Sequence, residues 1–85
     1  MYKILIAEDD KELGDLFARV LEKNGYETEI AENGAVALQM FEKDYFDLII
    51  SDVMMPVMDG YEMVSNLRKR GVKTPVLTIT AKGAF

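Results

Sequence analysis

The stretch DLIISD at residues 47–52 decides the fold of this chain, because a short apolar run there ends on an acid. Apolar runs of this length between polar residues are typical of strands buried in a parallel sheet. A second run of the same kind, KILIA at residues 3–7, is followed directly by Glu8 and Asp9. If the two strands are parallel neighbours, about 4.8 Å apart, their carboxyl ends bring Glu8, Asp9 and Asp52 together.

These converging acids predict a site for a hard divalent cation. Several carboxylates in a small space repel one another, and a bound cation offsets that repulsion. Carboxylate oxygens suit Mg²⁺, which is held by a few such groups and keeps several waters. We therefore expect Glu8, Asp9 and Asp52 to form a Mg²⁺ site.

Acids near strand ends have a second common role, which is to cap the N-terminus of a helix. Asp10 precedes an amphipathic segment, and Asp59 begins the D-x-x-E pattern of a capping box. For Asp10 and Asp59 the helix cap is the preferred interpretation. For Glu8 and Asp9, convergence with Asp52 favours the metal site.

Strand and helix patterns alternate along the chain. Helical spacing of apolar residues predicts helices around 13–21, 34–41 and 60–67, and strand patterns cover 3–7, 26–31, 47–51 and 76–80. The resulting β-α-β-α-β-α-β order predicts an α/β fold with an open parallel sheet, right-handed crossovers and helices on its faces. In such sheets ligands bind at the carboxyl ends of the strands, where the predicted acids lie.

Composition limits the class of function. The chain has 85 residues, a formal net charge of −5 and no cysteine, and we expect one domain spanning residues 1–85. The negative charge argues against nucleic-acid binding by this segment, because phosphate contacts need clustered Lys and Arg. No run reaches the roughly 20 apolar residues that span a bilayer. The absence of cysteine fits a cytoplasmic protein.

Three stretches carry a resemblance to a known family. They are KILIAEDD at 3–10, DLIISDVMMP at 47–56 followed by MDG at 58–60, and PVLTITA at 75–81. In this order and spacing they resemble the receiver domain of two-component response regulators. The resemblance implies a flavodoxin-like sheet, for which the family's strand order is 2-1-3-4-5.

The resemblance also implies a function and residue roles. Asp52 would be the phosphoacceptor, taking a phosphoryl group from the phosphohistidine of a partner histidine kinase. Asp9, Asp52 and the backbone carbonyl of Met54 would bind Mg²⁺ directly, and Glu8 would act mainly through a metal-bound water. The hydroxyl of Thr80 would hydrogen-bond a phosphoryl oxygen in the active state. Such a domain phosphorylates itself at most, so we expect a regulator of signalling and transcription rather than a turnover enzyme.

The chain departs from the family pattern after residue 80. A full receiver continues through a fourth helix, a fifth strand and a fifth helix, so we expect a receiver truncated after its fourth strand. It would then lack the Lys of the fifth strand, and Lys82 is better interpreted as a solvated loop charge. The edge of strand 76–80 and the first-helix face with Leu13, Phe17 and Val20 would be uncovered. Such surfaces predict a homodimer or a larger assembly.

Two other functions stay open. The chain is an interaction module if its site binds metal but phosphotransfer is lost with the missing segment. A hydrolase with an aspartyl nucleophile is a weaker alternative, because those enzymes typically carry D-x-D where this chain has EDD at 8–10. Dinucleotide binding is disfavoured, since no G-x-G-x-x-G follows the first strand.

The loop after Asp52 is rich in methionine. Met54, Met55 and Met58 could form a surface for a flexible partner contact, although packing under the loop is the simpler interpretation. Three aromatic residues are also expected to serve packing. They are Tyr26, Tyr45 and Phe46.

Overall fold

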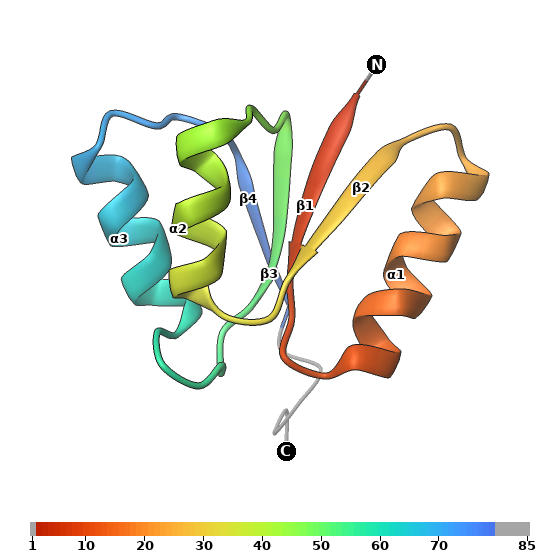
Figure 1. Cartoon of the computed structure of the whole chain (residues 1–85), viewed down its shortest axis with the longest axis horizontal. Coiled ribbons are helices and arrows are strands. Elements are labelled where there is room, and N and C mark those ends of the chain that lie inside the picture. The colour runs from red at the N-terminus through yellow and green to blue at the C-terminus, as the bar shows by residue number, and fades with distance from the viewer. Residues whose placement is uncertain (1, 80–85) are drawn as a thin grey trace.

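The structure of the protein is a computed structural model that describes residues 2–79. Along the chain these residues form β1 (Lys3–Ala7), α1 (Lys11–Lys23), β2 (Glu27–Ala31), α2 (Gly34–Lys43), β3 (Leu48–Asp52), α3 (Gly60–Lys69) and β4 (Val76–Ile79). In the described part of the chain the strands make one parallel sheet in the order β2-β1-β3-β4 (Figure 1). The predicted flavodoxin-like α/β fold is confirmed.

Each helix starts at a capping residue that the sequence supplies. The side chains of Asp10, Asn33 and Asp59 accept a hydrogen bond from the backbone N–H three residues on, at 3.2, 2.9 and 2.9 Å. Such a cap satisfies one of the backbone donors that the first helical turn leaves without a partner. The capping roles predicted for Asp10 and Asp59 are confirmed.

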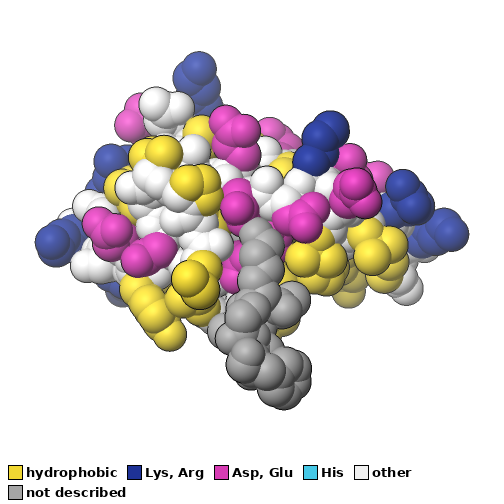
Figure 2. All heavy atoms as spheres, turned by 90° about the horizontal axis from the view of Figure 1, so that it is seen from below, with side chains coloured by type: hydrophobic (Ala, Val, Ile, Leu, Met, Phe, Trp, Pro, Cys, Tyr) yellow, Lys and Arg dark blue, Asp and Glu magenta, His cyan; other side chains and the backbone are white. Residues whose placement is uncertain are grey.

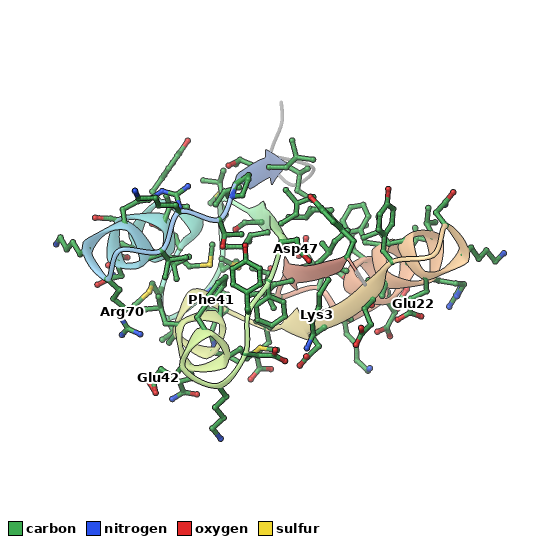
Figure 3. The ribbon with its side chains drawn as sticks, turned by 90° about the horizontal axis from the view of Figure 1, so that it is seen from above. Lys3, Glu22, Phe41, Glu42, Asp47 and Arg70 are labelled. Carbon is green, nitrogen blue, oxygen red and sulfur yellow. The ribbon has the colours of Figure 1, made fainter. Side chains whose placement is uncertain are left out.

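The larger core lies between the sheet and the pair of helices α2 and α3 (Figure 1). Burial of each large apolar side chain contributes about 1.5–3 kcal/mol. Phe46 packs edge-on against Phe41, with ring centroids 5.1 Å apart. The guanidinium of Arg70 lies 3.6 Å from the carboxylate of Glu42, and this ion pair links the ends of α3 and α2 (Figure 3). The buried members of the core are Leu5, Ala7, Ala31, Ala37, Leu38, Phe46, Ile49, Met55, Met63 and Leu67.

The opposite face of the sheet is covered unevenly. Side chains alternate along a strand, so the buried Ile4 and Ile6 point away from α2 and α3, toward the face that carries α1. Among the described elements α1 packs on β2 and β1, and β4 lies at the other edge of the sheet. Leu77 in β4 is 54% exposed, and Val20 in α1 is 51% exposed. The described residues therefore leave apolar surface on α1 and β4.

The aromatic residues correct one expectation. Phe46 is fully buried, as predicted, and Tyr26 packs edge-on against Tyr2 with ring centroids 5.5 Å apart. Tyr45 is 66% exposed, so its predicted packing role is wrong. It follows α2 in a connection that lies on the surface, where an apolar ring need not find a partner.

A small cluster of charged side chains lies near the amino end of the sheet. The ammonium of Lys3 bonds the carboxylate of Asp44 and lies 2.8 Å from that of Glu29. These hydrogen bonds, the one to Asp44 first, raise the pKa of Lys3 above its ordinary value. Lys3 and then the backbone N–H of Tyr45 lower the pKa of Asp44. The backbone N–H of Lys3 also donates to the Asp47 carboxylate at 2.8 Å, which ties β1 to the start of β3 (Figure 3).

The lowered pKa of Asp44 predicts a pH-dependent contribution to stability. A carboxylate with a depressed folded-state pKa stabilises the fold above its ordinary value of 3.8, and that contribution is lost as the pH falls through the folded value. We expect Asp44→Asn to lower the melting temperature slightly at about pH 7, since an exposed ion pair contributes little. The difference from the wild type should vanish near pH 2.

Thermal unfolding monitored by circular dichroism between about pH 7 and pH 2 measures this difference, because stability follows proton binding over that range. Glu32→Gln, which removes an exposed acid from another part of the chain, is the control for the loss of one negative charge. A difference between Asp44→Asn and the wild type that stays constant with pH would contradict the role of the ion pair.

Candidate metal and phosphoacceptor site

The predicted acids lie side by side at the carboxyl ends of β1 and β3. The two strands pair in parallel with Ala7 opposite Ser51, so Glu8 and Asp52 follow at neighbouring positions. One oxygen of each of Glu8, Asp9 and Asp52 lies within 4.8 Å of the others. Figure 2 shows acidic side chains gathered near the centre of this end of the molecule, with hydrophobic side chains on both sides. The structure thus brings the three predicted acids into one cluster.

The acids of the cluster differ in burial. Glu8 and Asp52 are only 2% and 1% exposed, whereas Asp9 is exposed to solvent. The Glu8 carboxylate accepts a hydrogen bond from the backbone N–H of Asp10 at 3.0 Å. Oδ1 of Asp52 accepts a longer hydrogen bond, 3.4 Å, from the backbone N–H of Met54. Buried carboxylates are costly unless hydrogen bonds, opposite charges or a metal compensate them, so this arrangement indicates a binding site.

The donor set fits a hard cation. All the clustered groups offer carboxylate oxygens, the ligands that Mg²⁺ prefers. Oxygens that share one Mg²⁺ are at most about 4.2 Å apart, twice the usual metal–oxygen distance. The carboxylates, which lie within 4.8 Å of one another, would therefore need only a small inward adjustment, or a bridging water, to share an ion.

The loop that joins β3 to α3, residues 53–59, carries the other expected ligand. The side chain of Met54 is 65% exposed, and Met55 packs into the core at 9% exposure. The packing interpretation therefore holds for Met55 and not for Met54. Val57 has a φ of 68°, in the left-handed region that β-branched residues rarely adopt. The role of the Met54 carbonyl as a metal ligand stays a prediction.

Two of the residues discussed from the sequence lie outside the described residues. They are Thr80, the expected switch hydroxyl, and Lys82, the expected loop charge. The described part of β4 ends at Ile79, which is paired with Asp52 in the ladder between β3 and β4. The switch role of Thr80 therefore stays a prediction.

Supporting residues around Asp52 were not singled out from the sequence. The buried hydroxyl of Ser51 donates a hydrogen bond to the backbone carbonyl of Asp52 at 2.8 Å. The backbone N–H of Gly60 donates to the carbonyl of Val53, also at 2.8 Å. The sequence signal for Gly60 is its place directly after the capping residue Asp59, where the helix begins close to the loop. No comparable signal marks Ser51, which follows the ordinary strand pattern.

The chain matches one known family along almost its whole length. A sequence profile described as the response regulator receiver domain matches residues 4–84. The chain is 43% identical over 84 residues to the probable transcriptional regulator ycf29 of Porphyra purpurea, covering 96% of this chain and 40% of that protein. It is 42% identical over 82 residues to the transcriptional regulatory protein PcoR of Escherichia coli, covering 96% and 36%. The chain thus spans about two fifths or less of these relatives.

Solved structures agree with the sequence match. The chemotaxis protein CheY4 of Vibrio cholerae superposes with a TM-score of 0.91 at 38% identity, over 99% of this chain and 72% of that chain. The response regulator TrrA of Thermotoga maritima, solved with Mg²⁺ and BeF, gives 0.89 at 34% identity, over 98% and 72%. A structure of the histidine kinase ThkA in complex with TrrA gives 0.88 at 33% identity, over 100% and 73%.

The geometry of the acids predicts that Mg²⁺ stabilises the folded protein. A ligand present at about ten times its dissociation constant adds about 1.4 kcal/mol to stability. For a domain of this size that corresponds to a rise of roughly 5–10 °C in melting temperature. We expect this shift for the wild type in millimolar Mg²⁺ and a clearly smaller shift for Asp9→Asn.

Differential scanning calorimetry with and without Mg²⁺ measures the two shifts. Asp59→Asn is the matched control, because it also removes one acid while Asn can still cap α3. Its shift should equal that of the wild type. Equal shifts for Asp9→Asn and the wild type would count against the site.

Proposed function

The chain belongs to the response regulator receiver domains, and from that premise we propose that it accepts a phosphoryl group on Asp52 in a two-component pathway. The observation that carries the proposal is the burial of Asp52 at the end of β3, within 4.8 Å of the oxygens of Glu8 and Asp9. The relatives are response regulators and transcriptional regulators, which supports a role in signal transduction and transcription rather than in metabolism.

The chemistry requires a nucleophile and a way to offset charge. An oxygen of Asp52 forms the bond to phosphorus as the bond from phosphorus to the imidazole nitrogen of the donor breaks. The electron pair of the broken bond stays on that nitrogen, which takes up a proton. When bound, Mg²⁺ neutralises the charge that would otherwise keep the carboxylate and the phosphoryl group apart.

The other proposed residues would serve this transfer by holding the metal or by responding to the new phosphoryl group. Asp9 and the carbonyl of Met54 would hold the metal with Asp52, and Glu8 would act mainly through a water on that metal. The backbone N–H of Met54, 3.4 Å from Oδ1 of Asp52, helps to orient the nucleophile. The hydroxyl of Thr80 would turn toward the new phosphoryl group, which makes it the proposed switch.

The proposed phosphodonor is a histidine kinase. The neighbour TrrA has been solved in complex with the histidine kinase ThkA and, separately, with Mg²⁺ and BeF, which supports both the donor and the metal. Among the described residues no helix is long and apolar enough to cross a membrane. A cytoplasmic location and a single receiver domain over residues 1–85 remain part of the proposal.

The second candidate function is an interaction module that binds metal without completing the switch. The relatives are much longer than this chain, which covers 40% or less of the two described above. The activity of those longer proteins as a whole therefore cannot be assigned to this segment. Phosphorylation of the isolated chain separates the two candidates.

Phosphorylation is measured by the intact mass of the chain after incubation with a small phosphodonor, acetyl phosphate, and Mg²⁺. We expect a single phosphoryl adduct on the wild type and none on Asp52→Asn, because that change removes the nucleophile. Asp44→Asn, at the opposite end of the sheet, is the control and should carry the adduct. A wild type that binds Mg²⁺ but gains no adduct would favour the interaction module.

We also propose that the chain self-associates, through the edge of β4 or the face of α1. The supporting observations are the position of β4 at the edge of the described sheet and the exposed side chains of Leu77, Leu16 and Val20. Unpaired strand edges and contiguous apolar surface favour contact with another chain.

Light scattering at high protein concentration tests this association. We expect a mass above that of the monomer, and a fall toward the monomer when a charge enters the surface that is used. A fall with Val20→Glu would identify the α1 face, and a fall with Leu77→Glu would identify β4. Ser65→Glu places the same charge on an exposed position of α3 and should leave the mass unchanged. A strictly monomeric wild type would rule out both surfaces.

A further inference from the structure

The loop of residues 53–59 is held at two points by backbone hydrogen bonds from glycines. The N–H of Gly60 donates to the carbonyl of Val53 at 2.8 Å, and the N–H of Gly34 donates to the carbonyl of Met58 at 3.1 Å. Val53 and Met58 lie on either side of Met54 in the sequence. The segment with the Met54 carbonyl is therefore anchored at both ends, once from α3 and once from α2.

Both glycines approach the loop too closely for any side chain. A Cβ atom at Gly60 would lie 2.5 Å from the carbonyl oxygen of Asp52. A Cβ atom at Gly34 would lie 2.7 Å from the carbonyl oxygen of Met58 and 2.9 Å from its Cγ, whereas ordinary contacts begin at 3.4 Å. The positive-φ glycines of the described chain are Gly25 and Gly71. Space, and not a left-handed backbone, therefore requires glycine at position 34.

The helix that carries Gly34 is capped and packed at this end. The side chain of Asn33 accepts a hydrogen bond from the backbone N–H of Val36 at 2.9 Å, which caps α2. Ala37 and Leu38, one turn further along, are buried in the core. A side chain added at position 34 could not be accommodated by a shift of α2 without disturbing this packing. The loop would have to move instead.

Hydrogen bonds, one from outside the loop and one within it, hold the backbone of the loop near Val57. Val57 has a φ of 68° although its side chain is 81% exposed, so packing of that side chain does not hold this unfavourable conformation. The described contacts that fix the neighbouring backbone include the hydrogen bond from Gly34 and one from the N–H of Met58 to the carbonyl of Pro56, at 2.7 Å. Loss of the anchor at Gly34 would therefore allow the loop to relax.

We propose that Gly34 is a positioning residue for the metal site, although it lies on α2, which contributes no acid to the cluster. Its N–H and its missing side chain fix Met58, and through the loop they set the place of the Met54 carbonyl relative to Asp52. This inference rests on the proposed function, because it assumes that Mg²⁺ binds at Glu8, Asp9 and Asp52.

Titration of the folded protein with Mg²⁺ alone, followed by isothermal titration calorimetry, tests the proposal. We expect Gly34→Ala to weaken Mg²⁺ binding about tenfold, as changes to residues that orient metal ligands typically do. Leu38→Ala is the control for a loss of core packing, since it removes a buried side chain one turn further along the same helix. Its Mg²⁺ affinity should stay within about twofold of the wild type, because a cavity lowers the stability of the fold. Unchanged affinity for Gly34→Ala, or equal losses for both variants, would overturn the proposal.

A second measurement uses the wild type and so does not depend on the variant folding. Coupling between two sites is reciprocal, so bound Mg²⁺ should strengthen the contact made by the Gly34 N–H. We expect the exchange of this amide hydrogen to slow about tenfold on Mg²⁺ binding, the same factor as in the titration. The N–H of Asp44, bonded to the carbonyl of Met40 at the other end of α2, is the internal control.

The outcomes separate this inference from the proposed function. If the wild type binds Mg²⁺ and exchange at Gly34 does not respond, the positioning role is wrong and the phosphoacceptor role is untouched. If Mg²⁺ binding responds to Gly34 as expected but acetyl phosphate gives no adduct on Asp52, the phosphoacceptor role fails alone. A wild type that binds no Mg²⁺ contradicts both.

Discussion

The parallel pairing of β1 with β3 is the constraint on which the rest of the molecule depends. Its register places Ala7 opposite Ser51, so the residues that follow, Glu8 and Asp52, lie side by side at the carboxyl ends of the two strands. Side chains alternate along a strand, and a slip of one residue would therefore turn Asp52 to the other face. Burial of Ile49 against α2 and α3 opposes such a slip, because the same slip would remove Ile49 from the core. Hydrophobic packing thus determines the position of a charged group.

That position is costly for so small a protein. Glu8 and Asp52 are nearly inaccessible to water, and carboxylates lose much of their hydration when they are buried. An apolar residue of similar size would stabilise the sheet better at either position. The buried acids therefore indicate a binding site and do not serve the stability of the fold. At the other end of the sheet, the acids that meet Lys3 are partly exposed and cost much less.

Much of the fold and part of the site follow from the sequence alone. Periodicity locates the strands and helices, and capping chemistry identifies the roles of Asp10 and Asp59, because both depend on nearby residues. Convergence of Glu8 with Asp52 required only the assumption that their strands are neighbours. The contact of Gly34 with Met58 could not be foreseen, since it joins two segments through a distance between backbone atoms that no residue pattern records. The exposure of Tyr45 was missed for a similar reason, because aromatic character does not reveal on which side of a connection a ring lies.

The site and the uncovered apolar surface are connected through β4. Ile79 pairs with Asp52 in the ladder, and Leu77, two residues earlier, is exposed on the face that carries α1. An edge strand with few buried contacts opens more readily than a central one, and its motion reaches the backbone of its partner. Any chain that covered Leu77 would restrain β4 and, through the ladder, the strand that ends at Asp52, the proposed phosphoacceptor. Self-association and the proposed chemistry would then be coupled by the stability of a single strand pair.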